Sequence, residues 1–439
     1  MEFSPMTIFR FLPRLSIGGV MLLTCGVAVA QHDVGGGTTR DAATPDSSSR
    51  AKRTTTRAAV RKPRPPVRRG ITAEQYNKQG DEFFTAEEYD DALEAYNKAV
   101  QLKPIASAYY HIGWIYNDRD QFAQAIEPLS QAARLRADYA EPHQELGYAY
   151  YKLSRSQEAI PEFQNAISLK PDYGLAYLGL GDVYFYQTKQ YAPAMNAYRE
   201  GVRFKTDNAT AFYNLAWCYN ELNMHSAAAP AARQAIALKA DYPEAYNELG
   251  YANRMLGGQQ PKDSARARQL FNEAIGAYRE AVRLRPRYGL AYTGLGDAYF
   301  VDLKQYQQAV PAYEQSISIS PNNARVRYNL GWCYNDLGRF AESSEQLREA
   351  VRLKPEYVEA HSELGFAYLK LHRLPAALEE LRNAIRLKND YSTAHLYLGF
   401  VYIEQKNKAG AQAEYQILKR LDPAQAQQLF DAAPPNMRN

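Results

Sequence analysis

The pattern of apolar and polar positions repeats about every 34 residues along residues 71–423. Each period holds two stretches in which apolar side chains recur every three or four residues, the spacing of amphipathic helices. In one of these stretches, Tyr109, Ile112 and Tyr116 fall on a single stripe that would face a partner helix. Each period is therefore predicted to fold as a hairpin of two helices, and about ten hairpins follow one another.

One small residue holds the same position in every hairpin and defines its register. Successive register residues are separated by 33, 34, 34, 35, 34, 46, 35, 34 and 34 residues. Small residues are expected where two helices approach closely, and the prolines that close many of the periods end the second helix. The register residues are Gly80, Gly113, Gly147, Gly181, Ala216, Gly250, Gly296, Gly331, Gly365 and Gly399.

A longer repeat of three hairpins is superimposed on this period. The three tryptophans each follow a register residue directly, in the related segments GWIYND, AWCYNE and GWCYND. The segment YGLAYLGLGDVYF likewise has a near copy, YGLAYTGLGDAYF. We predict one extra hairpin followed by three triplets of hairpins, over residues 71–104, 105–207, 208–322 and 323–423.

Two further segments depart from the regular pattern. The 46-residue step contains an insertion at about 257–269, which is predicted to form a loop and an N-terminal extension of the second helix. Residues 424–439 are predicted to form a C-terminal capping helix and a tail, because an apolar helical pattern precedes the prolines near the end.

In register, length and residue type, the pattern over residues 71–423 resembles the tetratricopeptide repeat. The resemblance implies an all-α fold, a right-handed α-solenoid superhelix of about ten helix-turn-helix repeats, in which each hairpin is stabilised by stacking on its neighbours. It also implies that a second stripe of each first helix lines a concave groove, where extended peptides or partner helices bind.

In this chain the second stripe is unusually aromatic. Trp and Tyr offer rigid apolar area with a hydrogen-bonding edge, which suits a binding surface. The alternative is that these rings pack against the next hairpin and that their spacing records gene duplication. The predicted groove residues are Tyr110, Trp114, Asn117, Tyr148, Tyr151, Asp182, Tyr213, Trp217, Asn220, Tyr251, Asp297, Tyr328, Trp332, Asn335, Phe366 and Phe400.

Signals of catalysis are weak, and we predict that the chain is not an enzyme and uses no cofactor or metal ion. The sequence contains no paired-histidine motif, cysteine cluster, phosphate loop or nucleophile elbow. His143, His361 and His395 each take the place of a packing tyrosine four residues before the register glycine, so we interpret them as core or interface residues.

Residues 1–30 are predicted to be a signal peptide. Arg10 and Arg14 precede an apolar stretch that ends in Ala-Val-Ala, which favours cleavage after Ala30. Retention of the stretch as a membrane anchor and lipidation at Cys25 are the two alternatives. Each of them predicts an exported protein, periplasmic or secreted and in some cases membrane-attached, in a bacterial envelope.

Residues 31–70 differ sharply from the repeats. They hold ten Lys and Arg against three Asp and almost no large apolar side chains. This composition is typical of a disordered basic linker. Contact of this segment with an anionic surface is one expectation, whereas specific binding to nucleic acid is not predicted.

The sequence therefore predicts a scaffold for protein–protein interaction, with a peptide or partner helix bound in the aromatic groove. A carbohydrate-binding scaffold, or one for polysaccharide export and assembly in a bacterial envelope, is the alternative. Aromatic platforms with nearby Asn and Asp side chains also suit sugar rings.

Overall fold

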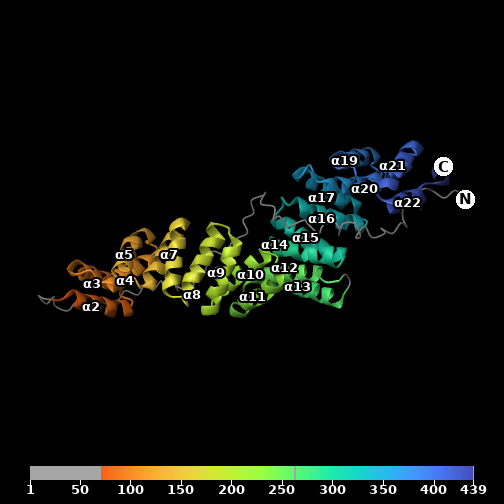
Figure 1. The fold of residues 1–439 in the computed structure, drawn as a ribbon. Coiled ribbons are helices and arrows are strands. Elements are labelled where there is room, and N and C mark those ends of the chain that lie inside the picture. The colour runs from red at the N-terminus through yellow and green to blue at the C-terminus, as the bar shows by residue number, and fades with distance from the viewer. Residues whose placement is uncertain (1–70, 262–263, 439) are drawn as a thin grey trace. The chain divides into compact units, whose positions relative to one another are not determined.

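A computed structural model describes residues 71–261 and 264–438. These residues form helices and turns with no β-strand among them, and Figure 1 shows the helices as hairpins that follow one another in chain order. This arrangement confirms the predicted all-α solenoid. The predicted signal peptide, 1–30, and basic linker, 31–70, lie outside the described residues.

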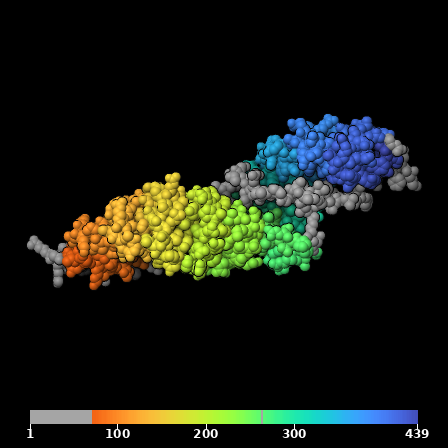
Figure 2. All heavy atoms as spheres, in the orientation of Figure 1, coloured from red at the N-terminus to blue at the C-terminus, as the bar shows by residue number. Residues whose placement is uncertain are grey.

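Residues 71–284 form the first of two compact units. In Figure 2 its hairpins are contiguous bands, each packed against the next. The helices are α2 Ala73–Thr85, α3 Tyr89–Leu102, α4 Ala106–Asp118, α5 Phe122–Leu135, α6 Ala140–Lys152, α7 Ser156–Leu169, α8 Gly174–Asp182, η4 Val183–Gln187, α9 Tyr191–Phe204, α10 Ala209–Glu221, α11 His225–Leu238, α12 Pro243–Gly258 and α13 Ala265–Leu284.

The described residues from 285 onward form the second unit, so the division falls inside the triplet predicted over 208–322. After four hairpins, a short helix packs its apolar residues into the core of the last hairpin. The helices are α14 Gly289–Asp297, η5 Ala298–Asp302, α15 Tyr306–Ile319, α16 Ala324–Asp336, α17 Phe340–Leu353, α18 Val358–Lys370, α19 Leu374–Leu387, α20 Ser392–Glu404, α21 Lys408–Leu421, α22 Pro423–Ala432 and α23 Pro435–Arg438.

Most register glycines lie where the first helix of a hairpin crosses the second. A Cβ atom added at Gly331 would lie 2.5 Å from Cγ of Leu347, and one added at Gly113 would overlap Cγ of Leu129 in the same way. Both leucines are fully buried. The close approach of the two helices therefore requires a residue without a side chain at this position.

The one alanine in the register series has a matching change across its hairpin. Ala216 and Ala232 are both fully buried in one core cluster, and Ala232 holds the position that Leu129 and Leu347 hold in their hairpins. A small residue on the second helix leaves room for one methyl group on the first. Ala216 and Ala232 together thus fit into the space that a glycine and a leucine fill in those two hairpins.

The two 35-residue steps have a structural cause. They begin at Gly181 and Gly296, and in these two hairpins the first helix ends in a five-residue π-helical segment, η4 or η5. A π-helical turn accommodates one extra residue without breaking the helix. The extra residue therefore changes the direction of the side chains at the end of the first helix only.

The insertion lengthens both helices of its hairpin. Helix α12 continues to Gly258, and α13 has 20 residues, whereas the second helices of the neighbouring hairpins have 14. The two helices take up both ends of the predicted loop, and residues 262–263 between them lie outside the described residues. The insertion therefore extends the hairpin as helix rather than as a long loop.

Replacing Gly331 with Ala should destabilise the protein, because the new methyl group overlaps Leu347. Overpacking of this kind costs about 1–3 kcal/mol, and the better helix propensity of Ala offsets about 1 kcal/mol of it. The thermal unfolding midpoint of the full chain measures the loss.

The Leu347→Ala variant supplies the control. On its own this substitution leaves a cavity and lowers the free energy of unfolding by about 2–5 kcal/mol. Adding Gly331→Ala to it recreates the Ala216–Ala232 pair and should raise the unfolding midpoint. If the unfolding midpoint of the double variant were lower than that of Leu347→Ala, the space at the helix crossing would not explain why glycine is found at position 331.

Candidate binding face

The predicted groove residues lie on one side of the first helices, at three positions of the register: three before, one after and four after the register residue. This side is called the first-helix face. Its members divide by exposure. Half-buried are Tyr110, Trp114, Tyr148, Asp182, Tyr251 and Trp332, whereas Asn117, Tyr151, Tyr213, Trp217, Asn220, Asp297, Tyr328, Asn335, Phe366 and Phe400 are buried.

Each tryptophan packs against a phenylalanine of the preceding hairpin. The ring centroids lie 5.0 Å apart for Trp114 and Phe84, and 5.1 Å apart for Trp217 and Phe185, in edge-to-face geometry. Trp332 meets its phenylalanine at 4.9 Å in the same way. The rings therefore contribute to the seam, the surface along which two neighbouring hairpins pack.

The exposure of the three tryptophans is unequal. Trp217 is only 8% exposed, whereas Trp114 and Trp332 are half-buried. The packing alternative therefore applies to all three residues, and the groove role stays a prediction for Trp114 and Trp332. One side of each indole packs in the seam, and two of the three keep part of the ring open on the first-helix face.

The predicted groove asparagines serve the seam instead. The side-chain amide of Asn117 donates to Oε2 of Glu145 at 2.8 Å and to the backbone carbonyl of the same residue at 3.0 Å. Asn220 donates in the same way to Glu248, and Asn335 to Glu363, always 28 residues along the chain.

These three asparagines are 1–3% exposed, so their expected place in an open groove requires correction. At four residues after the register position, the side chain turns toward the following hairpin rather than toward solvent. A buried amide needs hydrogen-bond partners, and the glutamate of the next hairpin supplies them. Each pair fixes the register of two neighbouring hairpins.

The hairpins that have an aspartate in place of the tryptophan carry a second kind of polar contact. Tyr198 donates its hydroxyl to Asp182 at 2.7 Å, and Tyr313 donates to Asp297 at 2.7 Å. Burial raises the pKa of Asp182 to about 7, against the opposing effect of the hydrogen bond from Tyr198. This carboxyl is thus held in an environment that disfavours its charge.

The following hairpin completes each of these sites. Asn214 donates to the hydroxyl of Tyr198 at 3.0 Å. Asn329 donates to Tyr313 at 3.2 Å. The three-hairpin period of the sequence is therefore also a period of polar contacts: one hairpin has the aspartate–tyrosine contact, which an asparagine of the next hairpin completes, and the hairpin after it has the asparagine–glutamate contact. The third hairpin has neither.

Exposed leucines on the same face were not among the predicted residues. Leu175 is 41% exposed and Leu290 is 43% exposed, in the two copies of the YGLAY segment. Leu175 precedes Asp182 by seven residues, two helical turns, so both lie on one face. The duplicated YGLAY segment could have drawn attention to these leucines. Its glycines, however, indicate close helix packing and not a binding surface.

The histidines of the sequence analysis lie between the two helices of their own hairpins. Nδ1 of His361 lies 2.6 Å from Oε2 of Glu380, and His395 pairs with Glu414 at the same distance. Burial alone would lower the pKa of His361, but the hydrogen bonds to Glu380 and to the carbonyl of Pro355 raise it. His361 is therefore a buried hydrogen-bonding residue of the hairpin core.

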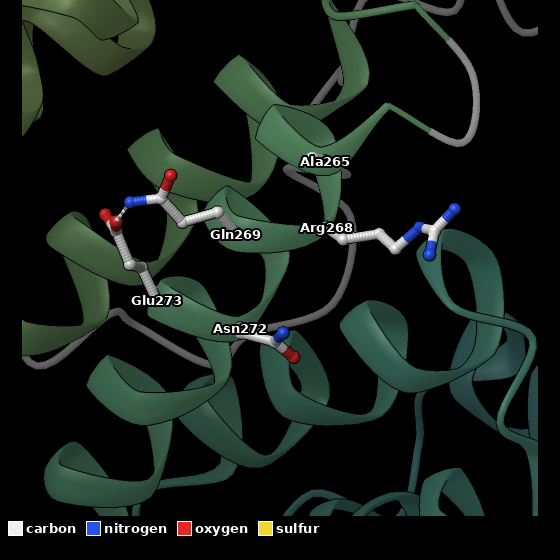
Figure 3. A pocket seen from close by; sticks show the side chains of 5 residues that line it. All are labelled: Ala265, Arg268, Gln269, Asn272 and Glu273. Atoms are coloured by element: carbon white, nitrogen blue, oxygen red, sulfur yellow. Dashed lines mark hydrogen bonds between the residues drawn. The ribbon is translucent and has the colours of Figure 1, made fainter.

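Other kinds of site find little support in the described residues. Within 71–261 and 264–438, no three His, Cys, Asp or Glu side chains are grouped as a metal site would need, and no helix has the length and apolar character to cross a bilayer. Figure 3 shows a hollow on α13 lined by Ala265, Arg268, Gln269, Asn272 and Glu273. All its side chains come from one helix, and Arg268 points away from Gln269 and Glu273, so it lacks converging groups.

Models of known protein families match most of the repeat region. Models described as "Tetratricopeptide repeat" or "TPR repeat" match residues 73–105, 113–154, 145–209, 209–242, 263–324, 300–361 and 362–426. A peroxisomal targeting signal receptor of Candida albicans is 30% identical over 81 residues, which are 18% of this chain and 14% of the receptor. The chain thus spans a small part of the curated relatives that it matches.

Two solved structures of repeat proteins are similar to part of the chain. YrrB, described as a TPR protein with an unusual peptide-binding site, is 21% identical with a TM-score of 0.39, over 46% of this chain and 97% of that one. A thermophilic TPR protein of Thermus thermophilus is 22% identical with a TM-score of 0.35, over 45% of this chain and 99% of that one.

The pKa of His361 predicts how stability changes with pH. A histidine whose pKa is raised by folding stabilises the protein most below its unfolded pKa of about 6.5, and this contribution is lost as pH rises through the folded pKa. The unfolding midpoint of the wild type should therefore fall, relative to His361→Gln, between about pH 6 and pH 8.

Glu380→Gln is the second variant, because it removes the carboxylate that His361 contacts and keeps the size of the side chain. It should remove the same part of the pH dependence as His361→Gln. If both variants kept the pH dependence of the wild type, the hydrogen bond between His361 and Glu380 would not couple to folding.

Proposed function

Because the chain belongs to the tetratricopeptide repeat family, we propose that it is a non-catalytic scaffold that binds an extended peptide or a partner helix on its first-helix face. Proteins of this repeat class generally support protein–protein interaction. The partial likeness to a peroxisomal targeting signal receptor is consistent with recognition of a protein segment.

The observation that carries this proposal is the set of apolar side chains left open on the face after the seams are formed. Leu175 and Leu290 are exposed at equivalent positions, and Trp114 and Trp332 keep part of their rings open. Apolar groups repeated along stacked helices suit a ligand that runs across several hairpins. Aromatic rings at such positions supply much of the binding energy in protein interfaces.

A polysaccharide ligand has less support. That alternative depended on asparagines beside the tryptophans, and these asparagines are buried and bonded to glutamates of the next hairpin. Sugar rings need polar partners at the edge of an aromatic platform. The exposed leucines Leu175 and Leu290 on the same face favour a protein ligand.

We also propose that the scaffold works after export, as the pattern of residues 1–30 predicts. The basic segment that follows would then lie on the same side of the membrane as the repeats. Cleavage after Ala30, lipidation at Cys25 and retention as an anchor all place the repeats there. A bacterial envelope, periplasmic or extracellular, fits the chain's two free and buried cysteines among the described residues.

Site-specific photocrosslinking tests the binding face. A benzophenone amino acid in place of Leu175 should capture a protein partner in cells that produce the full chain. The same replacement at Leu238, which is 40% exposed at the end of a second helix, should capture little. A Leu175→Asp variant should bind the captured partner about tenfold more weakly, as expected for loss of one interface anchor.

Equal capture at Leu175 and Leu238 would contradict a binding site on the first-helix face. Capture of polysaccharide in place of protein at Leu175 would support the alternative function. Circular dichroism of each variant would verify that its helical content is unchanged.

A further inference from the structure

Three hairpins of the chain carry an aspartate that accepts a hydrogen bond from a tyrosine of the same hairpin, at Asp81, Asp182 and Asp297. The copies at Asp182 and Asp297 are the most alike, and one of them lacks a component of the other. Asp182 and Asp297 each accept a hydrogen bond from a tyrosine of their own hairpin, and an asparagine of the next hairpin donates to that tyrosine. Each aspartate is followed directly by a π-helical segment. The two sites are therefore equivalent in position and share a tyrosine and an asparagine. They differ in that Tyr186 bonds to the asparagine of the first site, whereas Val301 holds the corresponding position in the second.

The sites differ in their cation. Nη1 of Arg325 lies 3.1 Å from both carboxylate oxygens of Asp297. Six residues before the register position of its hairpin, Arg325 corresponds to Thr210 in the hairpin that follows Asp182. The described residues place no cationic group against Asp182. One copy of the site thus contains a complete ion pair, and the other contains only its acidic half.

The incomplete site has the properties of a receptor for a cation. Asp182 is half-buried, so an entering side chain can reach it, and the exposed Leu175 lies on the same face. A partly buried carboxylate without a counter-charge is costly, and a guanidinium with two hydrogen bonds would offset that cost. The contact of Arg325 with both oxygens of Asp297 shows which group the geometry accepts.

We propose that the Asp182 site binds an arginine side chain from residues 50–69 of this same chain. This inference rests on the proposed function, because it takes the first-helix face as a surface for extended segments. The segment would then occupy, within one molecule, the surface that an external ligand uses.

Charge supports this occupant. Residues 50–69 contain seven Arg and two Lys and no acidic residue, whereas residues 71–439 hold 40 basic and 44 acidic side chains. Asp118 and Glu141 lie near the ends of first helices between the segment and Asp182. A basic segment that follows the first helices thus meets further carboxylates before it reaches the site.

Chain length permits the contact. The segment ends just before α2, and Asp182 ends α8, six helices further on. Packed helix axes lie about 8–10 Å apart, so six steps span at most about 60 Å. Twenty extended residues reach about 70 Å. Tethering also raises the effective concentration of the segment to about the millimolar range.

Limited digestion of the full chain with trypsin tests the proposal. Trypsin cleaves after Arg and Lys, so docking of residues 50–69 should slow cleavage there, and cleavage after Arg40 provides an internal reference. Thr210→Arg supplies the internal cation that Asp297 has, and Asp182→Asn removes the charge but can keep the bond from Tyr198. Both variants should accelerate cleavage within 50–69 by about threefold or more, the effect of losing one partly screened ion pair.

Arg325→Thr is the matched control, because it opens the second site and should not accelerate cleavage. Equal cleavage rates in the wild type, Thr210→Arg and Asp182→Asn would overturn the proposal. Protection that increases with protein concentration would assign the contact to a second copy and would also overturn it. If photocrosslinking at Leu175 still captured a partner in that case, the binding function would stand and only the occupant would be wrong.

Discussion

The contact between neighbouring hairpins is the interaction on which the rest of the structure depends. A two-helix hairpin cannot bury its own apolar face, so its stability comes from the hairpins on either side. In this chain the contact is made specific by buried side chains. Asn117 reaches Glu145 across one seam, and Trp114 meets Phe84 across another. Such pairs fix which residues of two hairpins lie opposite each other.

This constraint also determines which residues remain for function. The aromatic and polar residues of the first helices belong to the seams first, and only what they leave open can meet a ligand. Leu175 and part of Trp332 remain open, whereas Asn335 does not. The proposed ligand would therefore meet an apolar and acidic face whose shape is already set by the packing of the hairpins. Binding to such a face requires little reordering of the protein.

Much of the fold could be predicted from the sequence, because the close crossing of two helices needs a small residue, in most hairpins a glycine such as Gly331, which recurs at intervals of about 34 residues. The site was less predictable. The direction of Asn117 depends on how the next hairpin is rotated, which a helical stripe of one hairpin does not show. The π-helical segments had a signal in the 35-residue steps at Gly181 and Gly296, but a spacing does not reveal where one extra residue is placed. The sequence shows that Arg325 and Thr210 hold equivalent positions. It does not show that Arg325 pairs with Asp297, because the two residues lie in different hairpins.

Hydrogen exchange of the full chain with the Asn335→Ala substitution tests most directly the claim that buried contacts across the seams hold the array. Asn322, which is exposed, provides the control substitution. Loss of the two hydrogen bonds to Glu363 should cost about 1–3 kcal/mol. The account predicts faster amide exchange in α16 and α17 and also in α18 and α19, on both sides of the seam, with no such change in Asn322→Ala. Faster exchange confined to α16, or none at all, would contradict it.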